Sequence, residues 1–582
     1  MYICFNTSHW LSLGWVPPTR MTESIVAAAA SRIGKTVLHL DSSDFYGGLW
    51  ASFNFDGLQK MIEDAKGKSF AKDEFGIFNV EDNSLENILY KFFSFPINSN
   101  FEKFTIIRIY VGGEVPEVGE SGDGKIETSG TVWTQDKVKS EYRKFNVDLA
   151  PKLLFARGEL VELLISSNIA RYAEFRCVNR VLTWIGDVLE PVPCSRADVF
   201  ATKHVSVVEK RMLMKLLTSF LEYEKTKEHE EFKGVENKTF LEFLKSKKLT
   251  GNLIHYVLYA IAGGTDTTPC FEGIYRCKRF LISLGRYGNT PFLWSMYGCG
   301  ELPQCFCRLC AVFGGIYCLK RPIDSIKIEE NPADSKKSVE ILSNNKVLTC
   351  EHVVIGIDKA PKEFLSVADF TKGISRAVFV TNKSVLEYEK ESLTLLQFPP
   401  LEGLSDPVTI IELGPSTSSC PKGLCKFTFL LFASLPYKNP NCSVLVKLRL
   451  AQFQECPGKR KNIRKKIWLK QFQVLWSFYF NMVDTSQPGM CETTSSKIHL
   501  CSGPDIDLDF DHAVKQGRDI FSKICPDVEF LPRAPDPEEI IFEGTDAETG
   551  PEFEKNEKNV SESDGTKNEG DKTEASAEAT TD

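Results

Sequence analysis

The chain has 582 residues, of which 42% are hydrophobic and 25% are charged, so it is long enough for two globular domains with polar extensions. Its formal net charge is −8, and the stretch from Thr545 to Asp582 carries 12 acidic and 4 basic residues, which leaves the remainder near neutral. These values exclude a broad basic face for nucleic acid, and no apolar run reaches the length of a membrane-spanning helix.

The beginning of the chain predicts half of a dinucleotide-binding βαβ unit. A helix of small residues ends at Gly34, and the strand after it ends at Asp41, where such folds keep a ribose-binding acid. The strand and GxG turn expected before this helix are missing, since Pro18 and Arg20 stand where the two glycines would fall. Because proline removes a backbone donor and arginine blocks close approach, we interpret residues 1–21 as an atypical start that cannot cradle a pyrophosphate in the usual way.

The middle of the chain predicts a polar insertion followed by a mainly helical region. Residues 111–130, VGGEVPEVGESGDGKIETSG, have the glycine-rich polar composition that is typical of a mobile surface insertion. Apolar residues then recur at helical spacing in 149–174, 206–225 and 239–260. Between the first two of these runs, a β-hairpin is expected to turn at Gly186-Asp187.

The last part of the chain returns to short strands. We expect them at 350–357, 377–381 and 426–432, followed by a final strand, turn and helix in 498–521. Beyond Gly544 the sequence is acidic, rich in serine and threonine, and predicted to be disordered. The sequence therefore predicts a flavoprotein-like α/β fold, interrupted by a helical domain, with these boundaries: atypical start 1–21, α/β domain 22–110, insertion 111–145, helical domain 146–262, α/β domain continued 263–543, tail 544–582.

The densest motif is RYGNTPFLWSMYGCGELPQCFCRLCAVFGGIYCLK, from Arg286 to Lys320. Its glycines predict tight turns around a rigid surface. Glu301 and Arg308 are seven residues apart, so a helix begun near Pro303 would place them about two turns from each other. Two interpretations stay open at this point: a packed helix with a solvated charge at each end, or a buried Glu–Arg pair that serves a functional site.

Several cysteines surround this motif, namely Cys299, Cys305, Cys307, Cys310 and Cys318. Their spacing is not the paired CxxC of a zinc ribbon, and several would point to opposite sides of a helix, so we expect buried thiols and no metal site. The 18 cysteines of the chain follow no regular framework, and the first residues make a poor signal peptide. We therefore expect a soluble protein of the cytosol with reduced thiols.

Together with DSSDFYGG at Asp41 to Gly48, this motif closely resembles the signature regions of the Rab escort protein and Rab GDP-dissociation inhibitor superfamily. Further stretches resemble escort proteins in particular: SNIARYAEF at 167–175, VPCSRADVF at 192–200, VEKRMLMK at 208–215 and SGPD at 502–505. The similarity runs from about Glu23 to Phe542 and implies the α/β fold of the inhibitor type.

The resemblance implies a substrate-binding escort subunit without catalytic residues or cofactor. Such a protein binds unprenylated, GDP-bound Rab GTPases, presents them to the geranylgeranyl transferase alpha/beta heterodimer, and carries the prenylated Rab to membranes. The residues that match the Rab-binding platform of the family are Tyr46, Gly47, Gly48, Glu301, Arg308 and Cys318. Those matched to transferase binding are Phe280 and Arg286, with Phe280 expected to be an exposed aromatic.

Two other functions remain to be weighed. A Rab GDP-dissociation inhibitor is the first alternative, but the insertion at 111–130, the acidic extension and the escort-like motifs favour an escort protein. A flavin-dependent oxidoreductase is the second, and it requires the GxGxxG that the sequence lacks. The helical region would hold the geranylgeranyl lipid, although apolar stripes of this kind more often form an ordinary core.

Overall fold

The computed structural model describes residues 3–4, 20–61, 104–111, 133, 135–185, 188–202, 205–223, 232, 234–330, 337–366, 372–386, 393–400, 407–436, 474–493 and 495–533. All of them belong to one compact unit that ends at Arg533. Apart from Val111, the predicted insertion at 111–130 lies outside the described residues, as do most of the atypical start and the whole acidic tail.

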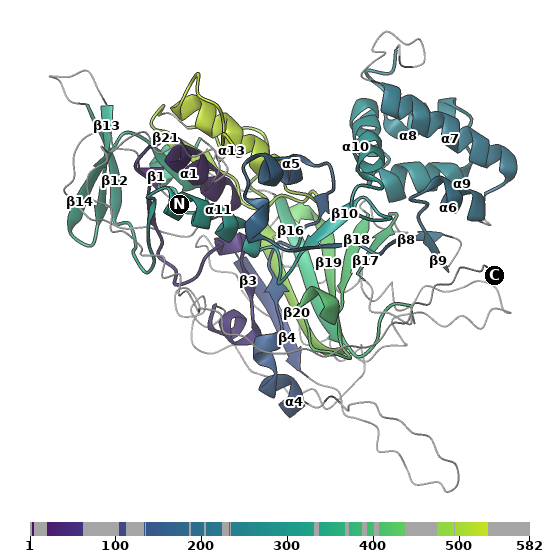
Figure 1. The fold of residues 1–582 in the computed structure, drawn as a ribbon, viewed down its shortest axis with the longest axis horizontal. Helices are drawn as coiled ribbons and strands as arrows, with labels where there is room; N and C mark the ends of the chain where they lie inside the picture. The colour runs from purple at the N-terminus through teal and green to yellow at the C-terminus, as the bar shows by residue number, and fades with distance from the viewer. Residues whose placement is uncertain are drawn as a thin grey trace, which may run out of the picture. The chain divides into compact units, whose positions relative to one another are not determined.

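A small α/β layer is built around the strand that ends before Asp41. Strand β2 (Leu38–Leu40) pairs in parallel with β11 (Ile316–Cys318) and antiparallel with β1 (Ile3–Cys4). Helix α1 (Met21–Arg32) packs against α11 (Glu301–Val312), which confirms the predicted helix and strand at the start of the fold (Figure 1). A run of four alanines in α1 is fully buried, because small side chains let neighbouring helices approach closely.

The final strand and helix complete this layer as predicted. Strand β21 (Ile498–Cys501) pairs in parallel with β15 (Val353–Gly356), and α13 (Asp511–Ile524) packs on α1. A separate antiparallel sheet is formed by β12 (Ser325–Glu330), β13 (Lys337–Ser343) and β14 (Lys346–Cys350).

An eight-stranded sheet is the largest element of the unit (Figure 1). All its neighbouring strands are antiparallel except the parallel pair β17–β8. Its β8–β9 turn pairs Ile185 with Val188, which confirms the predicted two-residue hairpin. In spatial order the strands are β4 (Phe104–Val111), β20 (Val474–Val483), β16 (Lys372–Thr381), β19 (Cys425–Pro436), β18 (Val408–Leu413), β17 (Thr394–Phe398), β8 (Arg180–Ile185) and β9 (Val188–Pro191).

The helical region is shorter at its beginning and longer at its end than the sequence predicts. Within 149–174 only Glu159–Ser166 is an α-helix, because Gly158 precedes it and Asn168, at φ 61°, follows it. The later helices are α6 (Arg196–Ala201), α7 (Val207–Glu222), α8 (Phe240–Ser246), α9 (Gly251–Ile254), the π-helix His255–Ile261 and α10 (Cys270–Ser283). Helix α10 lies past the predicted boundary at 262, yet it packs on α7 and α8.

Short elements connect these parts. The strands are β3 (Ser52–Phe53), β5 (Val147–Asp148), β6 (Leu154–Phe155), β7 (Phe175–Cys177) and β10 (Phe292–Ser295). The helices are η1 (Gly48–Trp50), α4 (Gln135–Ser140), η2 (Tyr142–Lys144), α5 (Glu159–Ser166), η3 (Ala170–Tyr172), η6 (Lys362–Phe364) and η7 (Pro415–Thr417). Among the described residues, no helix has both the length and the apolar character that crossing a membrane requires.

Candidate functional site

The first part of the candidate site is the turn Tyr46-Gly47-Gly48, which follows β2. Both glycines have positive φ angles, +99° and +54°, and a Cβ on Gly47 would come within 2.8 Å of the Cα atom of Ala51. Only glycine fits there without displacing the backbone. The turn leads into η1 and leaves Tyr46 half-buried.

The second part is the turn that precedes α11. Gly298 has φ +113°, and a Cβ on it would lie 2.5 Å from the carboxylate oxygen Oδ1 of Asp148. That oxygen accepts hydrogen bonds from the backbone N–H of Cys299 at 2.7 Å and from the hydroxyl of Ser52 at 2.6 Å. Its partner Oδ2 faces the ammonium of Lys426 at 3.3 Å, and both of these side chains are buried. A buried ion pair therefore holds the start of α11.

The first of these two parts contacts β11. The ring of Tyr46 contacts that of Tyr317 edge to face, with 6.3 Å between centroids, and Tyr317 precedes Cys318 in the strand. The backbone N–H of Asp41 also donates to the carbonyl of Cys318 at 3.1 Å. Burial raises the pKa of Tyr46, as do the nearby Cys307 and Asp41. The structure thus places Tyr46 and Cys318, two of the residues that the sequence assigns to the platform, on neighbouring elements.

Glu301 and Arg308 lie on one helix, as predicted, but they do not form the pair that one interpretation required. The amide of Gln304 donates to the Glu301 carboxylate at 3.5 Å, while the exposed Arg308 guanidinium lies over the ring of Tyr172, 4.6 Å from its centroid. No ion pair joins Glu301 to Arg308 within the described part of the chain. Burial and the nearby Asp148 raise the pKa of Glu301. Arg308 therefore has its donors available to a partner.

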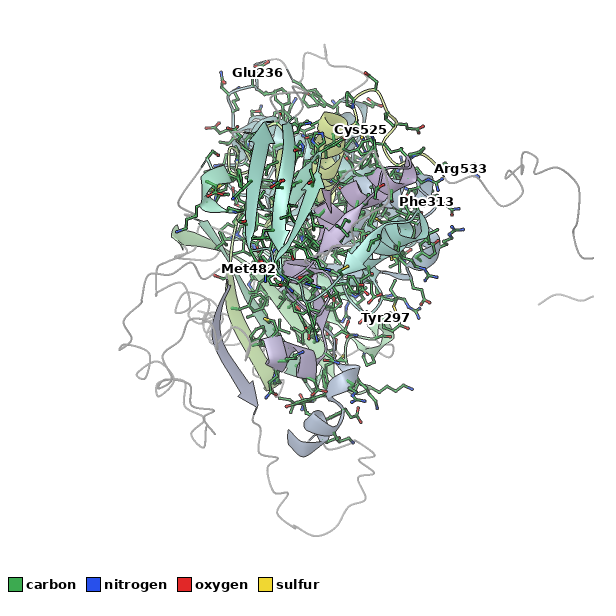
Figure 2. All side chains as sticks on the ribbon, turned by 90° about the vertical axis from the view of Figure 1, so that its left-hand side faces the viewer. Glu236, Tyr297, Phe313, Met482, Cys525 and Arg533 are labelled. Carbon is green, nitrogen blue, oxygen red and sulfur yellow. The ribbon has the colours of Figure 1, made fainter. Side chains whose placement is uncertain are left out.

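Exposed aromatic side chains lie at the two ends of α11. Tyr297, just before α11, is 49% exposed, and Phe313, just after it, is 40% exposed (Figure 2). By contrast, Cys299, Cys305, Cys307 and Cys310 are buried, which confirms the prediction for these four thiols, whereas Cys318 is only partly buried. Exposed aromatic residues are typical of protein-binding surfaces, where rigid rings anchor the partner.

Comparisons with known proteins agree with this geometry. The family model described as GDP dissociation inhibitor matches residues 131–395, and the model for the RAE1/2 domain I C-terminal region matches residues 374–506. The Rab proteins geranylgeranyltransferase component A of Drosophila melanogaster is 38% identical, and the match covers 91% of each chain. The chain belongs to the Rab escort protein family.

Other matches define the fold and separate the two branches of the superfamily. The Rab GDP dissociation inhibitor beta of Rattus norvegicus is 30% identical, but that match covers only 57% of this chain and 61% of the inhibitor. The crystal structure of Rab GDI from Plasmodium falciparum has a TM-score of 0.54 at 17% identity, covering 87% of this chain and 96% of that one. The predicted inhibitor-type α/β fold is confirmed.

Phe280 is not the exposed aromatic that the sequence analysis expects. Its side chain is 1% exposed and packs edge to face on Phe292, with 5.9 Å between ring centroids. It lies on the buried face of α10 with Ile274 and Cys277, at helical spacing. Arg286 is also engaged, donating to the carbonyl of Ala156 at 2.7 Å and to the carboxylate of Glu162.

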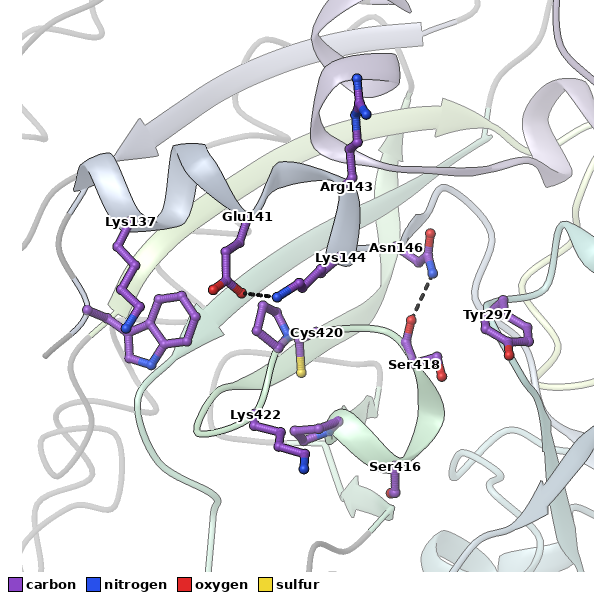
Figure 3. Close-up of a pocket in the computed structure, with 13 residues that line it drawn as sticks. Lys137, Glu141, Arg143, Lys144, Asn146, Tyr297, Ser416, Ser418, Cys420 and Lys422 are labelled. Carbon is purple, nitrogen blue, oxygen red and sulfur yellow. Dashed lines mark hydrogen bonds and ion pairs between the residues drawn. The ribbon is translucent and has the colours of Figure 1, made fainter. Parts of the chain in front are cut away.

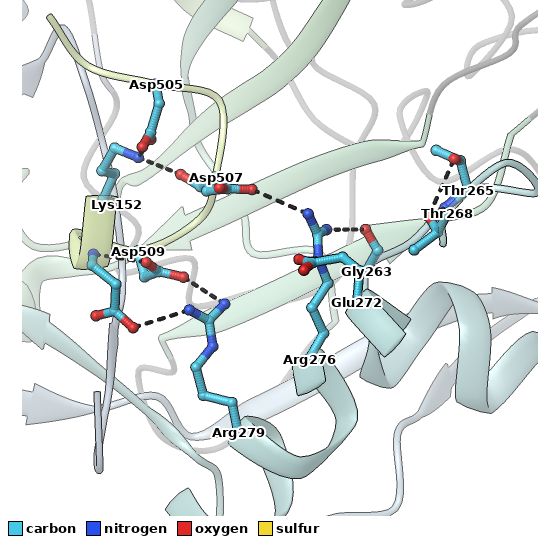
Figure 4. A network of polar contacts seen from close by, with 11 residues as sticks. Lys152, Gly263, Thr265, Thr268, Glu272, Arg276, Arg279, Asp505, Asp507 and Asp509 are labelled. Carbon is cyan, nitrogen blue, oxygen red and sulfur yellow. Dashed lines mark hydrogen bonds and ion pairs between the residues drawn. The ribbon is translucent and has the colours of Figure 1, made fainter. Parts of the chain in front are cut away.

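Ion pairs fasten α10 to the loop that follows the SGPD motif (Figure 4). Arg279 lies 2.7 Å from the carboxylate of Asp509 and 3.0 Å from that of Asp511, and Arg276 lies 3.5 Å from that of Asp507. Asp505 of the motif itself pairs with the buried Lys152. The helical region is thereby linked to the α/β layer through charges that the sequence analysis did not identify.

The residues at the dinucleotide position do not fit a flavin. Arg20, where a glycine would be needed, is buried and forms an ion pair with Asp358. Glu23, in the first turn of α1, has a fully buried carboxyl group whose oxygens have no hydrogen-bond partner among the described residues, and burial raises its pKa. The N-terminus of a helix favours a pyrophosphate only when backbone amides face it, so a guanidinium and a carboxyl group there leave no cradle.

Asp41 makes stability depend on pH. Burial raises its pKa to about 8, against the bonds donated by Ser43. The folded state therefore keeps a proton that the unfolded state loses near pH 4, so the free energy of unfolding falls by about 1.4 kcal/mol per unit as pH rises towards 8. We expect Asp41→Asn to gain stability over the parent protein across this range, measured by urea unfolding at pH 6, 7 and 8.

The exposed Asp519 provides the control for this prediction. Asp519→Asn makes the same chemical change at the surface, so the pH profile of Asp41→Asn is compared with that of this variant as well as with that of the parent protein. A constant difference between Asp41→Asn and the parent protein at all three pH values would contradict the prediction.

Proposed function

We propose that this protein is the escort subunit for Rab geranylgeranylation, a non-catalytic component that binds unprenylated, GDP-bound Rab and presents it to the transferase heterodimer. The observation that carries this proposal is the match to a component A protein over nine-tenths of both chains. The proposed platform of Tyr46, Gly47, Gly48, Glu301, Arg308 and Cys318 supports it, because Tyr46 is held against Tyr317 and Arg308 is exposed, and both residue types commonly anchor partners.

Reconstitution tests the proposed function. Purified protein mixed with unprenylated Rab, the transferase and geranylgeranyl pyrophosphate should stimulate lipid transfer, and the protein alone should transfer none. An inhibitor would instead extract lipidated Rab from membranes and fail to stimulate transfer. A variant with a family-like first strand and GxG turn is the control. If it stimulates transfer and the parent protein does not, the atypical start is defective; if neither does, the assigned function is wrong.

We propose that the lipid binds in the helical region. The side chains there are closely packed, so the helices would have to move apart to admit it. Leu216, Phe220, Phe240 and Leu258 are buried in one continuous core. A lipid of twenty carbons would therefore have to separate α7 from α8 or the π-helix. We place this cycle of binding and delivery to membranes in the cytosol, which is compatible with the free thiols of the described cysteines.

The transferase is proposed to contact the end of α10, with Arg286 and the neighbouring Tyr287 at the surface. Tyr287 is half-exposed, and the Arg286 guanidinium lies 5.2 Å from the centroid of its ring. Phe280 would then support this surface by packing inside the protein and would not touch the transferase itself.

Arg308→Ala should weaken Rab binding by ~2 kcal/mol, because a desolvated arginine is a typical interface anchor. Glu301→Ala should weaken binding non-additively with it, since both contribute to one surface. Lysine at position 308 should not restore affinity, because it cannot supply the planar fork that stacks on Tyr172. Titration of each variant with fluorescent GDP-bound Rab measures these effects.

Arg518→Ala is the matched control, since Arg518 is about half-exposed and lies 5.5 Å from the centroid of the Phe530 ring. It should bind Rab as the parent protein does. Normal Rab binding by Arg308→Ala and Glu301→Ala at native stability would show that the two residues are structural.

A further inference from the structure

A basic hollow lies beside the start of α11 (Figure 3). It has a volume of about 710 Å³ and is bordered by two segments, α4 with η2 on one side and η7 with the loop after it on the other. The cations that line it are Lys137, Arg143, Lys144 and Lys422. Of the described residues around it, only Glu141 is a carboxylate, and it lies 3.2 Å from the ammonium of Lys144. The hollow therefore has an excess of positive charge.

The two segments that border the basic hollow are joined by direct bonds. The side-chain amide of Asn146 donates to the carbonyl of Ser418 at 2.8 Å, and its backbone N–H donates to the carbonyl of Ser419 at 3.0 Å. At the far end, the ammonium of Lys137 lies 4.9 Å from the centroid of the buried Trp133 ring. The hollow is therefore a fixed feature built from two distant parts of the sequence.

Two strained residues lie together at the other end of the hollow. Tyr297 and Ser418 have φ angles of 65° and 55°, a region that residues other than glycine rarely occupy. The backbone N–H of Tyr297 donates to the carbonyl of Thr417 at 3.3 Å, which ties the η7 turn to the turn before α11. Such strain costs on the order of 1–3 kcal/mol per residue and clusters at binding sites. The bond from Tyr297 places this end of the hollow beside the turn that precedes α11 and Glu301.

We propose that the basic hollow binds an acidic polypeptide segment of the protein that docks on the adjacent platform. The excess charge selects an anion, and cations supplied by α4, η2 and the loop after η7, with the exposed Tyr297 at one end, suit an extended chain better than a small ion. A lipid surface fits less well, because the cations line a concavity and share it with Glu141. This inference goes beyond the proposed function and rests on it in one respect only, namely that the acidic segment belongs to Rab.

The test compares two triple variants that change the net charge equally. The first is Lys137→Glu, Lys144→Glu and Lys422→Glu. The control is Lys327→Glu, Lys346→Glu and Lys515→Glu, at exposed positions outside the hollow. Each is titrated, as the full chain, with a fluorescent deca-glutamate peptide and with unprenylated GDP-bound Rab, at low salt and at 0.5 M salt.

At low salt we expect the hollow variant to bind both probes about tenfold more weakly, the sum of three exposed charge pairs, and the control to change less than about twofold. The difference should shrink at high salt because ions screen exposed charges. Equal loss in both variants, or no peptide binding by the parent protein, overturns the proposal. So does binding to phosphatidylserine vesicles without binding to the peptide.

The two probes distinguish the binding specificity of the hollow from the proposed function of the protein. If the peptide depends on the hollow but Rab does not bind to the parent protein, the proposed function fails while the acidic specificity of the hollow stands. If Rab binds equally to both variants, the function stands and the assignment of the segment to Rab is wrong.

Discussion

Asp148→Ala should lower the free energy of unfolding by about 3–5 kcal/mol and disable the platform, because it leaves a buried ammonium without its carboxylate. Lys426 is fully buried, and its remaining bond in the described structure is to the carbonyl of Asn146. The same substitution removes the acceptor of the Cys299 N–H and frees the hydroxyl of Ser52. Urea unfolding and Rab titration on the same sample measure both effects.

The double variant Asp148→Ala/Lys426→Met tests the cause. Removing both charges should restore part of the lost stability, since an apolar pair no longer carries an unpaired ion. The pair of the exposed Lys144 and the partly buried Glu141 is the control, and Glu141→Ala should cost less than about 1 kcal/mol. A double variant as unstable as the single one would show that the hydrogen bonds at the α11 turn, and not the charges, stabilise the site.

The sequence predicts the part of the site whose signals are local. The turn at Tyr46 follows from a strand, an acid and two glycines, and the helix that begins at Glu301 follows from a glycine turn and apolar spacing. These features depend on neighbours in the chain, so their physical cause is visible in the order of residues. The same holds for the hairpin that turns after Ile185.

What the sequence did not reveal depends on contacts between distant residues. Asp148 lies in a two-residue strand, and its partner Lys426 is 278 positions away, so no spacing rule joins them. Strand β4 is held in the eight-stranded sheet by β20, more than 360 residues later. Pairings of this kind are specified by the whole fold, so the secondary-structure propensity of nearby residues cannot predict them.

The expectation that Phe280 is exposed was wrong for a different reason, because the residues near it in the sequence already indicated burial. Ile274, Cys277 and Phe280 recur every three residues, and they share the buried face of α10. A residue on such a stripe is expected in the core. The family resemblance indicates that this residue contacts the transferase, whereas the helical periodicity indicates that it packs in the core.

Phe280→Ala should therefore destabilise the whole protein, by about 3–5 kcal/mol, because it removes a fully buried ring and leaves a cavity against Phe292. Affinity for Rab and affinity for the transferase should fall together with the melting temperature, since one unit contains both surfaces. Phe280→Leu should cost less, because it keeps most of the buried apolar volume. Thermal unfolding and both titrations on one preparation provide the comparison.

Tyr275, which lies on the same helix and is 48% exposed, is the control for this effect. Tyr275→Ala should leave the melting temperature within about two degrees of the parent value, as surface substitutions commonly do. If Phe280→Ala instead kept native stability and Rab affinity but lost only the transferase, the ring would have to leave the core when the partner binds. The transferase would then recognise an opened form of α10, and Arg279, which is held by Asp509 and Asp511, would be the bond that resists the opening.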